Sequence, residues 1–131
     1  MKLTAVTPSL FTDDIDRSIA FYRDVLGFEV RITVPDRAPF VFVSLERDGI
    51  TVFLNDAAAA RRDASEATWL TVGKSGVTMF IDMENIVDFW TQIKGKAPVA
   101  MPLVEQWYGL TEFSVTDPDG YLLTFAEKTA K

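Results

Sequence analysis

Few side chains in this sequence could do chemistry, because its 131 residues include no histidine and no cysteine. Without cysteine there is no thiolate nucleophile, disulfide or zinc–sulfur site. Without histidine there is no imidazole base and no Ser-His-Asp triad. Acid–base chemistry would therefore depend on carboxylates, and Glu112 and Asp82 are the candidates because each lies within or at the end of an expected strand. Most strand carboxylates point to solvent, and that alternative stays open for both.

A run of aromatic residues is the second candidate for a functional role. Trp107 and Tyr108 precede Gly109, whose backbone is free to adopt unusual angles. Two large aromatic side chains beside such a residue could stack on a flat or cationic ligand. The alternative is simple packing against the neighbouring module. Trp69 is a weaker candidate of the same kind, and Trp90 is expected in a helix core from its spacing.

Composition and charge limit the classes of function. The apolar fraction of 48% and the charged fraction of 24% are those of an ordinary globular domain. A net charge of −6 and a pI near 4.6 leave no basic face for nucleic acid. No run approaches the roughly 18 apolar residues of a membrane span. The N-terminal segment lacks the pattern of a secretory signal. We therefore expect a cytoplasmic protein with neither nucleic-acid nor membrane partners.

The hydrophobic pattern predicts a first module at about residues 4–56. It begins with a strand at 4–12, and Asp13-Asp14 offers an N-cap for a helix that ends at Gly27. One face of that helix is apolar and consists of Ile15, Ile19, Tyr22 and Leu26. Strands are expected at about 28–34, 39–47 and 50–55, the last two joined at Asp48-Gly49. A linker at about 57–75 has an Ala-rich start that favours a short helix.

The second module, at about 76–127, repeats the first. It has a strand at 76–82, a helix capped by Glu84-Asn85, and strands near 99–103, 110–116 and 121–126. The apolar helix face consists of Ile86, Phe89, Trp90 and Ile93. A shift of 71 positions takes Asp48-Gly49 to Asp119-Gly120, Ile15 to Ile86, Ile19 to Trp90, Phe42 to Phe113 and Thr7 to Thr78. This shift predicts an internal duplication within a single domain, 1–131, in which each copy packs on the other.

Three segments resemble the vicinal oxygen chelate superfamily, which comprises glyoxalase I, extradiol dioxygenases, fosfomycin-resistance enzymes and bleomycin-resistance proteins. Residues 14–28 (DIDRSIAFYRDVLGF) resemble its first-helix signature, and residues 113–125, centred on Asp117-Pro118-Asp119-Gly120-Tyr121, resemble its C-terminal signature. Residues 76–94 resemble its second strand and helix. The resemblance implies an α+β fold of two βαβββ modules that form a curled mixed sheet around a cavity. It also implies a homodimer.

The same resemblance implies where enzymes of the family hold a divalent metal, on the first and last strands of each module. Those positions fall on Thr7, Phe53, Thr78 and Thr124. Zinc takes imidazole, thiolate or carboxylate ligands, and non-haem iron takes two histidines and a carboxylate. The neighbouring positions offer nothing better: Val6, Pro8, Val77, Met79, Leu123 and Phe125. We therefore expect no metal, no cofactor and no metal-dependent catalytic residue.

Strand alternation and the aromatic segment predict a mostly apolar ligand-binding set. It consists of Thr7, Ser9, Phe11, Phe53, Thr78, Phe80, Trp107, Tyr108, Glu112 and Thr124. The resemblance implies a metal-free protein that sequesters a hydrophobic or aromatic small molecule in the cavity between the modules. One alternative is a lyase or dioxygenase-like enzyme of the same family with an atypical or carboxylate-based site, using a residue such as Glu112. Another is a structural or regulatory protein whose cavity is filled.

Overall fold

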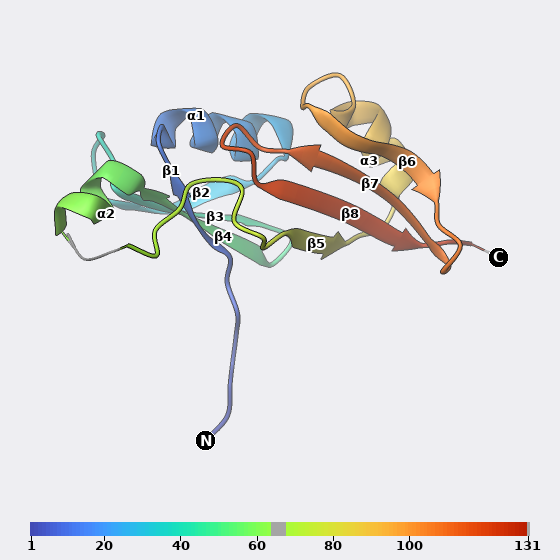
Figure 1. Ribbon diagram of the computed structural model, residues 1–131, viewed down its shortest axis with the longest axis horizontal. Coiled ribbons are helices and arrows are strands. Elements are labelled where there is room, and N and C mark those ends of the chain that lie inside the picture. The colour runs from blue at the N-terminus through green and yellow to red at the C-terminus, as the bar shows by residue number, and fades with distance from the viewer. Residues whose placement is uncertain (64–67, 131) are drawn as a thin grey trace. The chain divides into compact units, whose positions relative to one another are not determined.

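The computed structural model describes residues 1–63 and 68–130, which divide into two compact units (Figure 1). Unit one is Met1–Val72 and unit two is Gly73–Lys131. Each unit contains one four-stranded mixed sheet, so the predicted α+β fold of two similar modules is confirmed. The single domain and the cavity between modules stay predictions. Residues 64–67 of the predicted linker lie outside the described residues.

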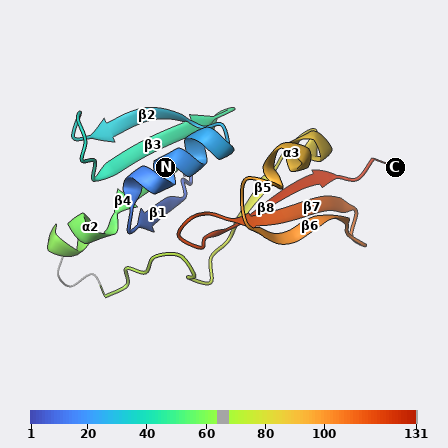
Figure 2. The same cartoon turned by 90° about the horizontal axis from the view of Figure 1, so that it is seen from above.

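Unit one is a sheet with a helix on one face. Its elements are β1 (Ser9–Thr12), α1 (Ile15–Ala20), η1 (Phe21–Val25), β2 (Glu29–Val34), β3 (Phe42–Arg47), β4 (Ile50–Asp56) and α2 (Ala57–Asp63). The strand order is β1-β4-β3-β2, with β1 parallel to β4 and the other pairs antiparallel. α1 covers one face of this sheet (Figure 2). The short helix predicted at the start of the linker is confirmed by α2.

The first helix begins and ends as the sequence predicts. The Asp14 side chain accepts a hydrogen bond from the backbone N–H of Arg17, which satisfies one of the free donors of the first turn. The four residues of its predicted apolar face are buried: Ile15, Ile19, Tyr22 and Leu26. The chain turns at Gly27, which has a φ of 76°. Its final turn is the π-helical segment η1, and the Leu26 carbonyl accepts a hydrogen bond from Arg47 Nη1 at 2.6 Å.

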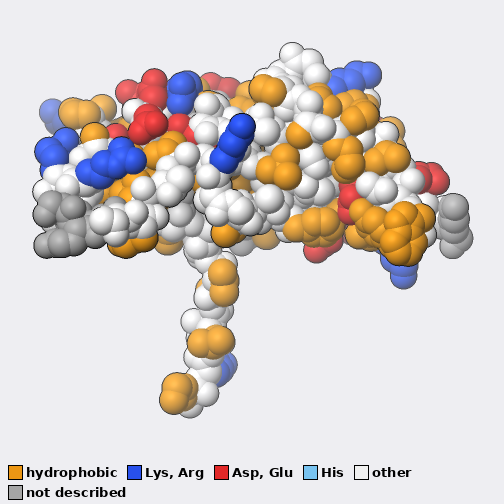
Figure 3. All heavy atoms as spheres, viewed as in Figure 1, with side chains coloured by type: hydrophobic (Ala, Val, Ile, Leu, Met, Phe, Trp, Pro, Cys, Tyr) orange, Lys and Arg blue, Asp and Glu red, His pale blue; other side chains and the backbone are white. Residues whose placement is uncertain are grey.

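The first strand is shorter than the predicted 4–12, because it has a partner only from residue 8 onward. The Pro8 carbonyl accepts a hydrogen bond from the Phe53 amide at 2.9 Å, and the ladder with β4 begins at Ser9. Proline has no N–H to extend the ladder in the other direction. The side chains of Leu3 and Val6 are exposed, on a segment that projects from unit one (Figure 3).

Unit two repeats this order of elements. They are β5 (Met79–Asp82), α3 (Ile86–Ile93), β6 (Val99–Glu105), β7 (Leu110–Thr116) and β8 (Leu122–Lys128). The sheet order is β5-β8-β7-β6, which matches that of unit one strand by strand. α3 packs on β7 and β8 through Ile86, Phe89 and Ile93, all buried as predicted. Trp90 is half-buried, with its ring 5.1 Å from that of Phe113. In the described parts of the chain, no helix is both long enough and apolar enough to cross a membrane.

The cap of α3 differs from the one predicted. Asn85 occupies the N-cap position, but it has a φ of 61° and its side chain makes no capping hydrogen bond. Glu127 on β8 caps the helix instead, because its two carboxylate oxygens accept hydrogen bonds from the backbone N–H groups of Asn85 and Ile86, each at 3.0 Å. The prediction that Glu84-Asn85 supplies the capping side chain is therefore wrong, because Glu127 supplies it. The group that satisfies these donors comes from a different strand.

The predicted equivalence of Phe42 with Phe113 is also wrong, by one residue. Ser44 pairs with Phe53 in unit one, and Ser114 pairs with Thr124 in unit two. A shift of 71 still relates β4 to β8, whereas β3 and β7 are related by a shift of 70. Because side chains alternate between faces of a sheet, one residue of slip exchanges the faces. The structural counterpart of Phe42 is therefore Glu112.

Candidate functional site

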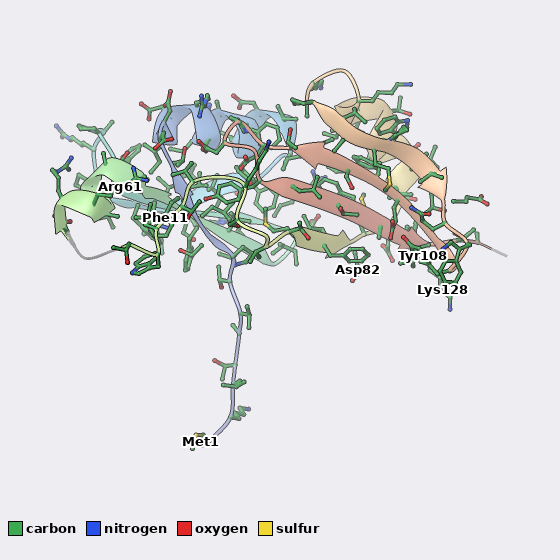
Figure 4. The ribbon with its side chains drawn as sticks, in the orientation of Figure 1. Met1, Phe11, Arg61, Asp82, Tyr108 and Lys128 are labelled. Atoms are coloured by element: carbon green, nitrogen blue, oxygen red, sulfur yellow. The ribbon has the colours of Figure 1, made fainter. Side chains whose placement is uncertain are left out.

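The candidate site lies on the face of the unit-two sheet opposite α3, which we call the open face of unit two. The strand register places its side chains in two rows that cross the sheet. One row is Phe80, Thr124, Ser114 and Met101, and the other is Asp82, Ala126, Glu112 and Val104. The opposite face carries the apolar side chains that pack toward α3, among them Phe113 and Phe125. The labelled Asp82 and Tyr108 lie on the side away from α3 (Figure 4).

Glu112 is the main candidate on this face, because it is a buried carboxylate that accepts hydrogen bonds from two neighbouring side chains. Only 4% of the residue is exposed. Its Oε1 accepts a hydrogen bond from the Tyr108 hydroxyl at 2.8 Å and a longer one from Gln106 Nε2 at 3.4 Å. Gln106 Nε2 also lies 3.6 Å from Met101 Sδ. Both donors are neutral, so the charge of a carboxylate here is met by dipoles and not by a cation.

A tight turn between β6 and β7 positions the aromatic residues. The Gln106 amide donates to the Leu110 carbonyl at 2.7 Å, and the Gly109 amide donates to the Gln106 carbonyl at 3.2 Å. Gly109 has a φ of 89°, which explains why glycine stands there. Trp107 and Tyr108 lie at the tip of this turn with ring centroids 5.4 Å apart in an edge-to-face arrangement. Trp107 is 93% exposed and Tyr108 is 47% exposed.

The contact with Glu112 changes the acidity of Tyr108. The hydrogen bond that the phenol donates to Glu112 raises the pKa of Tyr108 above its ordinary value near 10.0, and desolvation and the nearby negative charge act in the same direction. All three favour the neutral phenol, because they penalise a phenolate beside a carboxylate. Tyr108 is therefore held as a hydrogen-bond donor and is a poor general base.

Two hydroxyl groups and an aromatic ring complete the face. Ser114 Oγ and Thr124 Oγ1 are 2.7 Å apart and share one hydrogen bond. Thr124 pairs in register with Phe80, whose side chain is 54% exposed. The open face therefore has a mixed character, with the two carboxylates of Glu112 and Asp82, several neutral polar groups and exposed aromatic carbon. Such a mixture is typical of small-molecule sites.

The corresponding open face of unit one is far more aromatic. The rings of Phe42 and Phe53 lie 5.0 Å apart, and Phe11 contacts Trp69 with centroids at 5.6 Å. Its polar contact is Asn55 Nδ2, which donates to Ser9 Oγ at 2.9 Å and to the Leu10 carbonyl at 3.1 Å. By register, Phe11 and Phe42 of this face correspond to Asp82 and Glu112 of unit two.

The structure brings some predicted site residues together and separates others. Tyr108 contacts Glu112, Thr124 pairs with Phe80, and Ser9 pairs with Phe53. Thr7 and Thr78 precede their strands and do not belong to the ladders. Sequence reasoning missed Gln106, Met101, Ser114 and Phe42, which reach these faces. Three of them could have been found from the alternation of β3, β7 and β6, but the contact of Gln106 depends on the turn.

The four residues that the sequence resemblance assigns to metal positions do not fit a divalent metal. Thr7, Thr78 and Thr124 offer only neutral hydroxyls, and Phe53 offers no donor atom. Thr124 Oγ1 is in addition engaged with Ser114. Within the described stretches, no three residues of the types His, Cys, Asp or Glu gather as a metal site would require. The prediction of a chain without a resident metal stays a prediction.

A groove lined by residues from both faces of the unit-two sheet contains none of the predicted site residues. It has a volume of 380 Å³ and lies beside the start of α3. Its lining includes Ile86, Val87, Leu103, Glu105, Thr111 and Glu127. Glu127, one of the two acidic residues that line this groove, is engaged in capping α3 and therefore has a structural role.

The chain is similar to known proteins over nearly its whole length. A family model described as Glyoxalase/Bleomycin resistance protein/Dioxygenase superfamily matches residues 3–125. A comparison with curated proteins gives no match.

Solved structures share the fold at low sequence identity. A glyoxalase/bleomycin resistance protein/dioxygenase from Nocardioides superimposes with a TM-score of 0.77 at 18% identity, covering 98% of this chain and 85% of the other. TioX from Micromonospora sp. ML1 has a TM-score of 0.73 at 17% identity, covering 95% and 98%. A lactoylglutathione lyase from Agrobacterium tumefaciens has a TM-score of 0.67 at 20% identity, covering 95% and 92%. Identities this low establish a shared fold and no shared activity.

Proposed function

Since this chain belongs to the Glyoxalase/Bleomycin resistance protein/Dioxygenase superfamily, we propose that it is a metal-free member that binds and sequesters a hydrophobic or aromatic small molecule. One observation carries the proposal. The positions where the family's enzymes hold their metal carry Thr7, Phe53, Thr78 and Thr124, none of which is a good ligand for a catalytic divalent ion. The metal-dependent chemistries of the family therefore lack their donor set in this chain.

The binding surface in this proposal is formed by the open-face residues. Exposed aromatic carbon at Phe80, Trp107 and Tyr108 supplies contact area, and Glu112 supplies a polar anchor. A mostly apolar surface with a few placed polar groups is how proteins orient small ligands. Trp107 packs on Tyr108, which contacts Glu112, and its exposure favours a role in binding over one in folding, because a tryptophan that is 93% exposed contributes little to a core.

The first test is thermal unfolding of chelator-stripped protein with nickel, zinc, manganese, iron(II) or magnesium added separately. A ligand at 100 times its dissociation constant adds about 2.7 kcal/mol of stability. At this chain length that corresponds to a rise of roughly 8–14 °C in the midpoint. We expect no metal to give such a rise. A rise that persists in Thr7, Thr78 and Thr124 variants would show that a metal binds elsewhere, and would favour an enzyme.

The second test applies the same assay to a panel of aromatic and apolar small molecules. We expect at least one class to raise the midpoint, and we expect Phe80→Ala and Trp107→Ala to reduce that rise. Val87→Ala is a matched control, because Val87 is 59% exposed but lies on α3. If no compound in the panel changes the stability, the binding proposal fails and the structural or regulatory alternative is favoured.

An enzyme is the second candidate, and the environment of Glu112 favours it. Glu112 is 4% exposed as a residue, and both hydrogen bonds from Tyr108 and Gln106 go to the same carboxylate oxygen. A shielded carboxylate with an available oxygen could remove a proton from a small carbonyl or aromatic substrate. Glu112→Gln should then abolish any turnover detected. Turnover that survives this substitution, with no other open-face carboxylate required, excludes that enzyme.

A homodimer in the cytoplasm completes the proposal, and the family resemblance supports the dimer. Light scattering coupled to size exclusion measures the mass directly. A mass of twice the 14.6 kDa chain supports the dimer, and 14.6 kDa at all concentrations contradicts it.

A further inference from the structure

We propose that the ligand carries a protonated amine, and that Glu112 binds this cation beside the rings of Tyr108 and Trp107. This inference rests on the proposed function, because it assigns a chemical class to the ligand of the open face of unit two.

Glu112 has one oxygen available for a ligand. The hydrogen bonds from Tyr108 and Gln106 both go to Oε1. The other oxygen, Oε2, accepts none from the described residues. No buried side-chain oxygen or nitrogen of the described residues lacks a partner, so Oε2 reaches solvent. The site therefore presents one free carboxylate oxygen at the end of a largely buried side chain.

No cation of the described chain pairs with this carboxylate. The ion pairs of the described residues join other groups, and none includes Glu112. By register the nearest lysine is Lys128, which pairs with Leu110 on the row next to Glu112 and is exposed. The other acid in the same row is Asp82, which lies two strands from Glu112, roughly 10 Å along the row. The charge of Glu112 is therefore not neutralised by a cation of the described residues, which leaves it able to pair with a cationic ligand.

The fold does not require a carboxylate at this position. The counterpart of Glu112 in unit one is Phe42, and the counterpart of Asp82 is Phe11. Unit one builds the same four-stranded sheet with aromatic rings in both places. The two acids are therefore features of unit two that are not needed to build this sheet, and both increase the negative potential of its open face.

The neighbouring rings favour an organic cation over a metal ion. The Tyr108 ring is held beside Glu112 by its own hydroxyl, and the Trp107 ring lies 5.4 Å from it. Aromatic faces attract ammonium groups and also contact the apolar body attached to them. A metal would need several oxygen or nitrogen ligands, which the described residues do not gather here. An amine on a flat or short apolar body satisfies the carboxylate and the rings together.

The experiment compares two compounds of the same shape and different charge. 2-Phenylethylamine is a cation at pH 7, and 2-phenylethanol is neutral. Both are titrated into ¹⁵N-labelled wild-type protein, and the dissociation constants are taken from amide shifts near Tyr108 and Glu112. We expect the amine to bind at least about tenfold more tightly, because a hydrogen bond to a charged group is stronger than one between neutral groups. This comparison needs no variant.

Three variants identify the group responsible. In Glu112→Gln the preference for the amine should fall to within about threefold of the alcohol, since Gln keeps an acceptor for Tyr108 but removes the charge. Asp82→Asn is the matched control, an exposed carboxylate on the same row, and should keep the preference. Lys128→Gln should tighten amine binding by about twofold, because a repelling cation is removed. Circular dichroism confirms that each variant is folded.

The outcomes separate this inference from the proposed function. Equal binding of both compounds, or a preference that survives Glu112→Gln, overturns the cation assignment and leaves small-molecule binding intact. Failure of both compounds to shift the Tyr108 region, with stabilisation by neutral members of the aromatic panel, also overturns only the cation assignment. If neither these compounds nor the panel bind, the proposed function itself fails.

Discussion

Replacing Glu127 by alanine tests how helix α3 is stabilised. Its carboxylate accepts the backbone N–H groups of Asn85 and Ile86 at 3.0 Å each, so one side chain satisfies two of the four free donors at this end. Loss of an N-cap costs about 0.5–2 kcal/mol, and loss of a negative charge at a helix start costs about 0.3–1 kcal/mol more. Glu127 is half-buried, which places the expected loss for Glu127→Ala at about 1–2 kcal/mol.

The assay is urea or thermal unfolding followed by circular dichroism. At this chain length each kcal/mol lowers the midpoint by roughly 3–5 °C. Glu127→Gln should lose about half as much, because one acceptor oxygen remains and the charge is gone. Asn85→Gly is the decisive control, since Asn85 has a φ of 61° and makes no side-chain cap. Glycine adopts this φ freely, so we expect a change within about 0.5 kcal/mol. A silent Glu127→Ala with a costly Asn85→Gly would refute the cap seen in the structure.

Three further predictions concern unit two. Glu112→Gln should lower the pKa of Tyr108 toward 10.0, because the hydrogen bond to that carboxylate is the largest cause of the raised pKa. An alkaline spectrophotometric titration measures this pKa. In the wild type, the stabilising effect of this hydrogen bond is complete below pH 10 and is lost as the pH rises through the raised pKa. Gly76→Ala should lower the free energy of unfolding by roughly 1–2 kcal/mol, and Gly73→Ala should lower it by at least twice as much. Both glycines have φ near 80°, but of these two only Gly73 would place a Cβ on a backbone oxygen. Phe113→Ala should cost about 3–5 kcal/mol, because the ring is fully buried against three others; a loss below 1 kcal/mol would contradict that packing.

The helices could be predicted because their signals are local. Ile15, Ile19 and Tyr22 recur at helical spacing, and a capping Asp14 stands directly before them. The start of β1 and the cap of α3 could not be predicted in this way. β1 depends on where β4 supplies hydrogen-bond partners, and the α3 cap comes from Glu127, 41 residues beyond Ile86 in sequence. Such contacts are decided by tertiary packing, which propensities do not encode.

The candidate site was predictable in its members but not in its arrangement. Glu112 and Tyr108 each stood out by type, one as a strand carboxylate and the other as part of an aromatic pair. Their hydrogen bond depends on the turn between β6 and β7, which folds the Tyr108 ring back over the strand. The contribution of Gln106 depends on the same turn and was missed. Whether a strand carboxylate is exposed or buried depends on tertiary packing. The sequence alone therefore could not decide between a solvent-facing and a buried Glu112.

The slip of one residue between the modules decides what the open face of unit two can do. With a uniform shift of 71, Phe113 would take the place of Phe42 on the open face, and Glu112 would point toward the helix. A carboxylate there would be buried among Phe89 and other rings, which is costly for a charged group. The shorter shift along β7 sends Phe113 into the core and Glu112 to the open face instead. The same change that completes the apolar packing of α3 therefore places the carboxylate where a ligand can reach it.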